Sequence, residues 1–140
     1  MTRDANTGLD VLSLDECCDL LVRTPIGRVA VHLAEHPPAI FPINYFFDGH
    51  EIAFRTKPTS LLHRADQHTV AFEIDGVDRL YHLGWSVLVT GTLQEVTGHS
   101  EIIRLASLPL GPWAPGPKTQ WMRMSADTIT GRSIPTPSVP

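Results

Sequence analysis

Residues 41–62, FPINYFFDGHEIAFRTKPTSLL, decide the fold of this chain. Two runs rich in apolar and aromatic residues flank Asp48-Gly49, a dipeptide that strongly favours a two-residue β-hairpin turn. The stretch therefore predicts two antiparallel strands, over 39–47 and 50–56.

The turn length also sets which side chains share a face of this hairpin. A two-residue loop pairs Phe47 with His50, and the alternation continues away from the turn. The core face is then predicted to hold Ile43, Tyr45, Phe47, His50, Ile52 and Phe54. The other face holds Asn44, Phe46, Glu51, Ala53 and Arg55. We therefore expect Asn44 and Arg55 to lie close together outside the core, where a polar ligand could reach both.

The second strand runs through Arg55-Thr56-Lys57-Pro58 into a stretch rich in hydroxyl groups. A short helix is expected over 58–66, with Pro58 in its first turn. A guanidinium offers a two-pronged fork to phosphate oxygens, hydroxyls add hydrogen bonds, and a helix start adds unpaired N–H groups. The stretch therefore predicts a place to hold a phosphate.

The rest of the chain is predicted to consist of strands with short helices. Ser13 and Glu16 fit a capping box that begins a helix over 13–23, and a further helix is expected over 99–107. Proline and glycine exclude regular structure from 108–117. The remaining strands are expected over 27–33, 69–74, 81–96 and 120–129. Six strands and three short helices favour a mainly β fold, a small antiparallel barrel or sandwich.

Composition narrows the class of protein. A chain of 140 residues forms one compact domain, here 1–140, with 1–10 and 135–140 expected to be flexible tails. The net charge of −4, without a basic cluster, argues against a nucleic-acid partner. The sequence has no signal-peptide pattern, and no apolar run approaches the roughly 20 residues that span a membrane. The two cysteines are adjacent and are expected to stay reduced. These features predict a cytoplasmic protein with no membrane partner. The seven histidines form no cluster with the cysteines, so no metal site is expected.

In order along the chain, these pieces resemble the pyridoxamine 5′-phosphate oxidase-like family, the flavin-binding split β-barrels. The resemblance covers roughly residues 12–134 and depends on the order and spacing of its pieces. These are LSLDECCDLL, Ile26-Gly27-Arg28-Val29-Ala30, Pro42-Ile43-Asn44-Tyr45, Phe54-Arg55-Thr56, VAFEID, Gly84-Trp85-Ser86-Val87-Leu88-Val89-Thr90-Gly91 and Ile129-Thr130-Gly131-Arg132. The resemblance implies a six-stranded antiparallel split barrel that forms a homodimer, with FMN bound in clefts at the dimer interface.

The resemblance also implies roles for single residues. Arg55 and Thr56 would contact the ribityl phosphate or the flavin ring, and the following helix start, with Ser60, would contact the phosphate. The other candidates are Asn44 as a polar contact, Trp85 for ring stacking or packing, Ser86 for a backbone contact to the ring, and Arg123 for the phosphate or a substrate. Arg123 is assigned to the face of the last strand opposite Trp121, and Trp113 is a candidate cap of the pocket or interface anchor.

The chain departs from the family pattern next to Ser60. Members that hold FMN tightly commonly carry Gly-Ser/Thr-Lys here, whereas this chain has Thr59-Ser60-Leu61. Lys57, His63 or Arg64 could replace that lysine, since all lie within a turn or two. Without a replacement, losing one charge-assisted hydrogen bond of about 1.5–3 kcal/mol would weaken FMN binding roughly tenfold or more.

The function implied by the resemblance is an FMN-dependent oxidoreductase acting on a small molecule. The flavin would carry the redox chemistry, which agrees with the lack of a convincing acid or base catalyst in the sequence. Two alternatives stay open. One is a reductase of the same fold that uses the deazaflavin coenzyme as hydride donor, and the other is a dimer that stores flavin or senses a ligand without turnover.

Overall fold

The computed structural model describes residues 2–3, 5, 8–78, 80, 83–109 and 118–134. These residues form ten strands and three helices. In chain order they are β1 (Thr2–Arg3), β2 (Asp10–Val11), α1 (Leu14–Arg23), β3 (Ile26–Val31), β4 (Ala39–Asn44), β5 (Phe46–Phe47), β6 (Glu51–Thr56), α2 (Leu61–Arg64), β7 (Thr69–Asp78), β8 (Leu83–Glu95), α3 (His99–Ala106), β9 (Gln120–Ser125) and β10 (Thr128–Ser133). Trp113, the loop over 110–117 and the tail over 135–140 lie outside the described residues.

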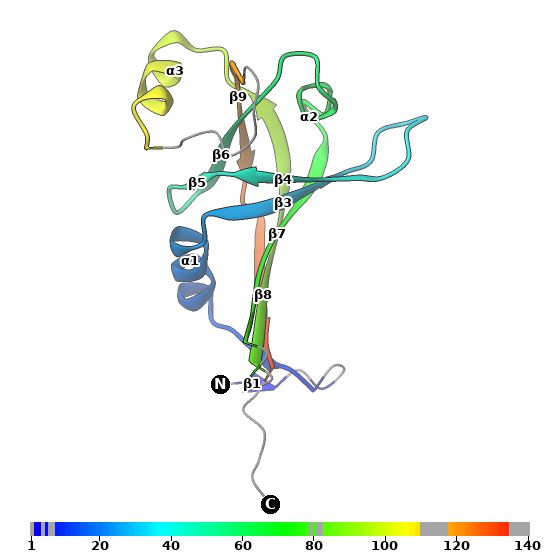
Figure 1. Cartoon of the computed structure of the whole chain (residues 1–140), viewed down its shortest axis with the longest axis vertical. Helices are drawn as coiled ribbons and strands as arrows, with labels where there is room; N and C mark the ends of the chain where they lie inside the picture. The colour runs from blue at the N-terminus through cyan, green and yellow to red at the C-terminus, as the bar shows by residue number, and fades with distance from the viewer. Residues whose placement is uncertain are drawn as a thin grey trace, which may run out of the picture.

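The strands form an antiparallel system that divides along β8. Most of β8 lies between β7 and β10, in a sheet of order β1-β2-β10-β8-β7-β3-β4. Its last residues, Leu93 to Glu95, pair instead with β9, which pairs with β6, and β6 pairs with β5. The long strands β7 and β8 run through the middle of the molecule, and the sheet curls around them (Figure 1). The mainly β split barrel expected from the sequence is confirmed.

The curled sheet encloses one main apolar core. The fully buried side chains at its centre come from both parts of the sheet: Val29, Ile52, Phe54, Phe72, Ile74, Val87, Val89, Leu93, Met122 and Met124. Helix α1 closes one side of this core through Cys17 and Leu21, and burial raises the pKa of the Cys17 thiol. None of the helices in the described part of the chain has the length and apolar character to cross a membrane.

The start of α1 follows the sequence prediction closely. The Ser13 hydroxyl accepts a hydrogen bond from the Glu16 amide at 3.1 Å, and the Ser13 amide donates to Glu16 Oε1 at 3.0 Å. This reciprocal pair satisfies two N–H groups at the helix start that have no partner within the helix. The predicted capping box is therefore confirmed.

The predicted hairpin register is wrong. Phe47 pairs with Ile52 rather than His50, so four residues, 48–51, separate the paired positions of β5 and β6. Asp48 Oδ1 accepts the amides of His50 and Glu51 at 2.8 and 2.7 Å, which stabilises the longer loop. Strand β4 pairs with β3 and not with β6. His50 is consequently exposed, whereas the other five residues assigned to the core face are buried.

Several predicted boundaries also shift. Helix α2 covers only Leu61–Arg64, and β7 continues through Asp75-Gly76 to Asp78. The predicted strand over 120–129 is two strands, β9 and β10, because the chain turns at Ala126-Asp127 and crosses from one part of the sheet to the other. Within the expected N-terminal tail, β1 pairs with β2, and β2 pairs with β10.

Tyr45, at the break between β4 and β5, carries a buried hydrogen bond that gives a first prediction. Its hydroxyl donates to the Leu21 carbonyl at 2.7 Å, and its ring meets Phe72 edge-on. Tyr45→Phe should lower the free energy of unfolding by about 1–3 kcal/mol, because the Leu21 carbonyl stays buried without this partner. Urea denaturation with an unchanged m-value is the measurement.

The control for this prediction is the pH dependence of stability. Burial raises the pKa of the Tyr45 phenol, so the folded chain keeps a proton that the unfolded chain releases above about pH 10. Wild-type stability should therefore fall as the pH rises beyond that value, and the Tyr45→Phe protein should show a smaller fall. Equal stability of the two proteins at neutral pH would contradict the prediction.

Candidate functional site

Four of the predicted site residues meet in one pocket of about 170 Å³. Three cationic side chains, two hydroxyls and an apolar wall line this pocket: Arg55, Lys57, Lys118, Thr56, Ser60, Phe41, Pro42, Ile43 and Leu62. None of these described lining residues carries a carboxylate. The chain as a whole carries a net charge of −4, so this concentration of positive charge is local. Cationic and hydroxyl donors around a small hollow are suited to bind a phosphate.

Strand β6 delivers two of these side chains at its end. Thr56 is buried, and its Oγ1 lies 2.8 Å from the Ser60 hydroxyl. Arg55 points to the other face of the strand, where its guanidinium carbon lies 5.2 Å from the centre of the Trp121 ring. A cation–π contact of this kind is worth about 0.5–1 kcal/mol at a partly exposed site and limits the orientations of the guanidinium.

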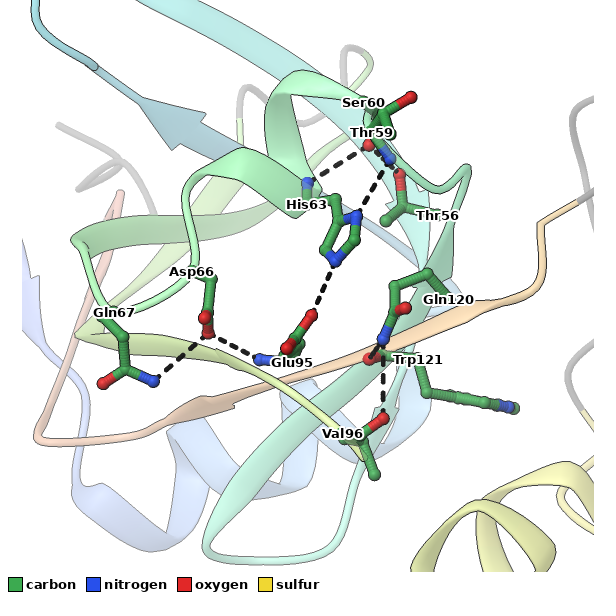
Figure 2. Close-up of polar contacts among 10 residues, drawn as sticks. All are labelled: Thr56, Thr59, Ser60, His63, Asp66, Gln67, Glu95, Val96, Gln120 and Trp121. Carbon is green, nitrogen blue, oxygen red and sulfur yellow. Dashed lines mark hydrogen bonds and ion pairs between the residues drawn. The ribbon is translucent and has the colours of Figure 1, made fainter. Parts of the chain in front are cut away.

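The segment 57–60, here called the phosphate loop, joins β6 to α2. Ser60 caps α2, because its Oγ accepts the His63 amide at 3.2 Å (Figure 2). Helix α2 has only four residues, so the helix start predicted to contribute to phosphate binding is too short to carry a substantial dipole. The cationic side chains and hydroxyls, rather than the helix, are therefore the groups of this pocket that could hold an anion.

The structure shows which of the proposed replacement cations lines the pocket near Leu61. Leu61, at that position, packs partly buried against the core. Of the three proposed replacements only Lys57 lines the pocket; His63 contacts Glu95 instead, and Arg64 is exposed and outside the lining. Lys118 is a fourth candidate, which the sequence analysis missed.

Lys118 reaches the pocket only through strand pairing. It lies just before β9, and the first residue of β9, Gln120, pairs with Thr56 at the end of β6. This pairing brings together parts of the chain that are about sixty residues apart in sequence. The signal that could have located Lys118 is the pairing of β6 with β9, which no local motif in either strand specifies.

Asn44 and Arg123 are not part of this pocket. Asn44 ends β4 and pairs with Ile26 of β3. Arg123 lies in the middle of β9 opposite Ala53, with its Nε 3.9 Å from Glu51 Oε2. The prediction that Arg123 faces away from Trp121 is wrong, because residues two apart in a strand point to the same side.

Trp85 and Ser86 lie at a second site. Trp85 lines a pocket of about 540 Å³ between the ends of β7, β8 and β10, and both residues line an adjoining hollow. The indole lies against Gly76, where a Cβ atom would come within 2.6 Å of it. The Val96 amide donates to the carbonyl of Trp121, which pairs with Arg55, so Val96 lies beside the Arg55 group. Trp85 and Val96 are about 35 Å apart along the chain, at about 3.3 Å per strand residue. One copy of the chain therefore carries the predicted site as two separate groups.

The described residues contain no candidate metal centre. Among them, no three side chains of histidine, cysteine, aspartate or glutamate are grouped so that they could hold an ion. Each free cysteine, Cys17 and Cys18, lies in α1 away from the pocket.

Comparison with known proteins identifies the family. The sequence model of the pyridoxamine 5′-phosphate oxidase family matches residues 13–133, nearly the whole described chain. The chain belongs to this family. An uncharacterized protein of Mycobacterium tuberculosis is a family-level relative, 31% identical over 129 residues that cover 88% of this chain and 84% of the relative.

Solved structures extend the comparison to the fold. The FAD binding protein of Mycobacterium smegmatis is 32% identical, with a TM-score of 0.76 over 89% of this chain and 97% of that one. A conserved protein of unknown function from Corynebacterium diphtheriae is 26% identical, with a TM-score of 0.75 over 90% and 98% of the two chains. The split barrel of this pyridoxamine 5′-phosphate oxidase family member is thus shared over almost the full length of its relatives.

Proposed function

We propose that this protein binds a flavin nucleotide, FMN, with its phosphate in the pocket lined by Arg55, Lys57 and Lys118. The observation that carries the proposal is the grouping of three cations with the Thr56 and Ser60 hydroxyls, with no carboxylate among the described residues of the lining. A phosphate monoester carries close to two negative charges at neutral pH and three acceptor oxygens. Two lysines would replace the single family lysine that Leu61 displaces.

We further propose that two copies of the chain complete the site. The pocket of about 170 Å³ suits a phosphate but is smaller than the roughly 300–1,000 Å³ of pockets that enclose a whole cofactor. The second pocket, at Trp85, is larger and mainly apolar, with an aromatic ring and exposed Val77 and Ile134 at its rim. A two-fold dimer that brings the Trp85 group of one copy to the Arg55 group of the other would enclose both ends of a flavin.

The proposed activity is an oxidoreductase that acts on a small-molecule substrate. When bound, the flavin supplies the redox chemistry by accepting and donating a hydride equivalent. The chain's own contribution is to hold the phosphate with Arg55, Lys57 and Lys118, to present Trp85 as a stacking surface, and to exclude water through the apolar wall of Phe41 and Leu62.

FAD is a second candidate cofactor. A structure with 32% identity and 97% coverage is that of an FAD binding protein. The phosphate pocket would accept the corresponding phosphate of either nucleotide, and FAD additionally requires space for its adenosine half. The deazaflavin coenzyme and a flavin-storing or sensing dimer without turnover also remain proposals to be separated by experiment.

The decisive experiment identifies the cofactor of the purified protein. The protein is purified without added cofactor, its absorbance is recorded, and any released nucleotide is identified by chromatography and mass spectrometry. FMN, FAD and the deazaflavin coenzyme are then titrated separately, with light scattering before and after each titration. Tight FMN binding to a dimer supports the proposal, whereas binding of the deazaflavin coenzyme alone would overturn it. Bound FMN that nicotinamide donors do not reduce would favour a storage or sensing role.

Lys118 gives a prediction specific to this chain. Lys118→Ala should weaken FMN binding by about tenfold, because it removes one charge-assisted contact to the phosphate. Arg64→Ala is the matched control, since Arg64 is an exposed cation close to the phosphate loop but outside the pocket lining. Isothermal titration at two salt concentrations measures both. Equal effects of the two substitutions would show that Lys118 acts only through general charge.

A further inference from the structure

His63 makes two side-chain hydrogen bonds that together determine its tautomer. The Thr59 amide donates to Nδ1 at 2.9 Å, and Nε2 lies 2.7 Å from Glu95 Oε2 (Figure 2). A backbone N–H can only donate, so Nδ1 must offer its lone pair and the ring hydrogen is on Nε2, from which it is donated to Glu95. His63 therefore acts as an acceptor toward the phosphate loop and as a donor toward β8.

Thr59 has a backbone conformation that threonine resists. Its φ is +64°, in the left-handed region, where a β-branched residue is a rare exception. Glycine adopts this conformation freely. The loop thus keeps a glycine-like turn without a glycine, and such a conformation persists only when its surroundings hold it.

Glu95, which orients the His63 ring, is itself held in place by hydrogen bonds. The backbone amide of Glu95 donates to Asp66 Oδ1 at 2.8 Å, and the backbone amide of Gln67 donates to the Leu93 carbonyl at 2.7 Å. The segment after α2 is therefore bonded to the end of β8, where Glu95 lies. A continuous series of hydrogen bonds connects β8 through Glu95 and His63 to the Thr59 amide.

We propose that His63 is a positioning residue for the phosphate loop, holding Thr59 in its left-handed conformation so that Lys57 and Ser60 face the pocket. His63 does not line the pocket, so it acts through the loop. Its amide also donates to Ser60 Oγ at 3.2 Å, and Ser60 Oγ lies 2.8 Å from Thr56 Oγ1, which ties both hydroxyls to the same arrangement. The inference rests on the proposed function in one respect, namely that the loop binds a phosphate.

A rescue experiment tests this role. FMN is titrated into the wild-type protein and into the His63→Ala, Thr59→Gly and doubly substituted proteins. His63→Ala should weaken binding roughly tenfold, because the loop then leaves the turn that threonine disfavours. Thr59→Gly should restore binding in the double variant to within about twofold of Thr59→Gly alone, since glycine needs no partner to adopt this φ. A double variant as weak as His63→Ala would overturn the proposal.

His68→Ala is the matched control for these titrations. His68 is a neighbouring exposed histidine whose Nδ1 contacts the Asp66 carbonyl rather than the phosphate loop. It should bind FMN like the wild type. If His63→Ala does not fold, Glu95→Ala replaces it: that variant keeps the ring but removes its anchor, and the same rescue by Thr59→Gly is expected.

A measurement without ligand separates this inference from the proposed function. Nitrogen-15 NMR of the free protein should show His63 with its hydrogen on Nε2, and the Thr59 amide should exchange slowly with solvent. In His63→Ala that amide should exchange at least about tenfold faster. If the wild type binds no flavin but both NMR results hold, the proposed function fails and the positioning role stands. Equal Thr59 exchange in the two proteins, or a hydrogen on Nδ1, would overturn the positioning role even if FMN binds.

Discussion

Gly91→Ala should unfold the protein or lower its free energy of unfolding by at least about 3 kcal/mol. A Cβ atom at this position would lie 1.6 Å from the Ser125 carbonyl oxygen and 2.6 Å from its carbon. The obstructing atoms are backbone, so no rotation of a side chain can relieve the collision. The substituted chain must move a strand or abandon the contact.

The reason for this close approach lies in how the sheet divides. Gly91 lies in β8 just before the strand changes partners from β7 and β10 to β9. The turn from β9 to β10 packs against β8 at this point. The Thr92 amide donates to Ser125 Oγ at 3.0 Å, and the Asp127 amide donates to the Thr90 carbonyl at 2.9 Å. A shift here would loosen both parts of the sheet at once.

Thermal and urea unfolding measure this prediction, with Gly98→Ala as the control. Gly98 precedes α3, and a Cβ there would meet only the Glu101 Cβ at 3.8 Å, an ordinary contact. Gly98 is the N-cap of α3, where alanine is less favourable than glycine, so Gly98→Ala should lower the free energy of unfolding by at most about 1 kcal/mol. A Gly91→Ala protein as stable as Gly98→Ala would mean that the turn at Ser125 does not approach β8 as described.

Arg55→Ala should weaken FMN binding by roughly 10- to 100-fold. Among the described residues that line the pocket, Arg55 alone carries a guanidinium, which can offer a two-pronged fork to phosphate oxygens. A net loss of about 1.5–3 kcal/mol, typical of a charge-assisted interaction, corresponds to this range. Fluorescence quenching of added FMN or isothermal titration measures the change. Stability should fall only by about 0.5–1 kcal/mol, from loss of the contact with Trp121.

Two controls make this result specific. Arg55→Lys keeps the charge but loses the fork, and its affinity should fall between those of the wild type and Arg55→Ala. Arg28→Ala removes an arginine on β3 that is bonded to Glu73 and Asp75 at 3.1 Å each, away from the pocket, and should leave FMN affinity unchanged. Unchanged affinity in Arg55→Ala itself would remove Arg55 from the site.

Local sequence signals predicted single elements well. Ser13 and Glu16 form the expected capping box, and β3 lies within one residue of the start predicted for the strand over 27–33. These features depend on residues within one turn or one strand, so neighbouring positions contain the relevant physics. Arg55 and Thr56 both line the pocket at the end of β6, and their role in phosphate binding stays a prediction.

The hairpin shows where local signals stop. Asp48-Gly49 favours a two-residue loop, yet the Asp48 carboxylate binds two amides of a longer loop. The pairing of β4 with β3 then takes the residues before Tyr45 out of the hairpin. Which of several apolar strands pairs with which is decided by the burial of whole faces, a property of the assembled sheet.

The sequence by itself therefore determined the fold class and the helix start at Ser13, and it placed Arg55, Thr56 and Ser60 close together along the chain. Only the tertiary structure decided that Lys118 joins them, that His63 instead contacts Glu95, and that Trp85 lies at a separate pocket. The physical reason is the range of the interactions. Capping and alternation act between near neighbours, whereas these three outcomes depend on β6 pairing with β9 and on β8 running between both parts of the sheet.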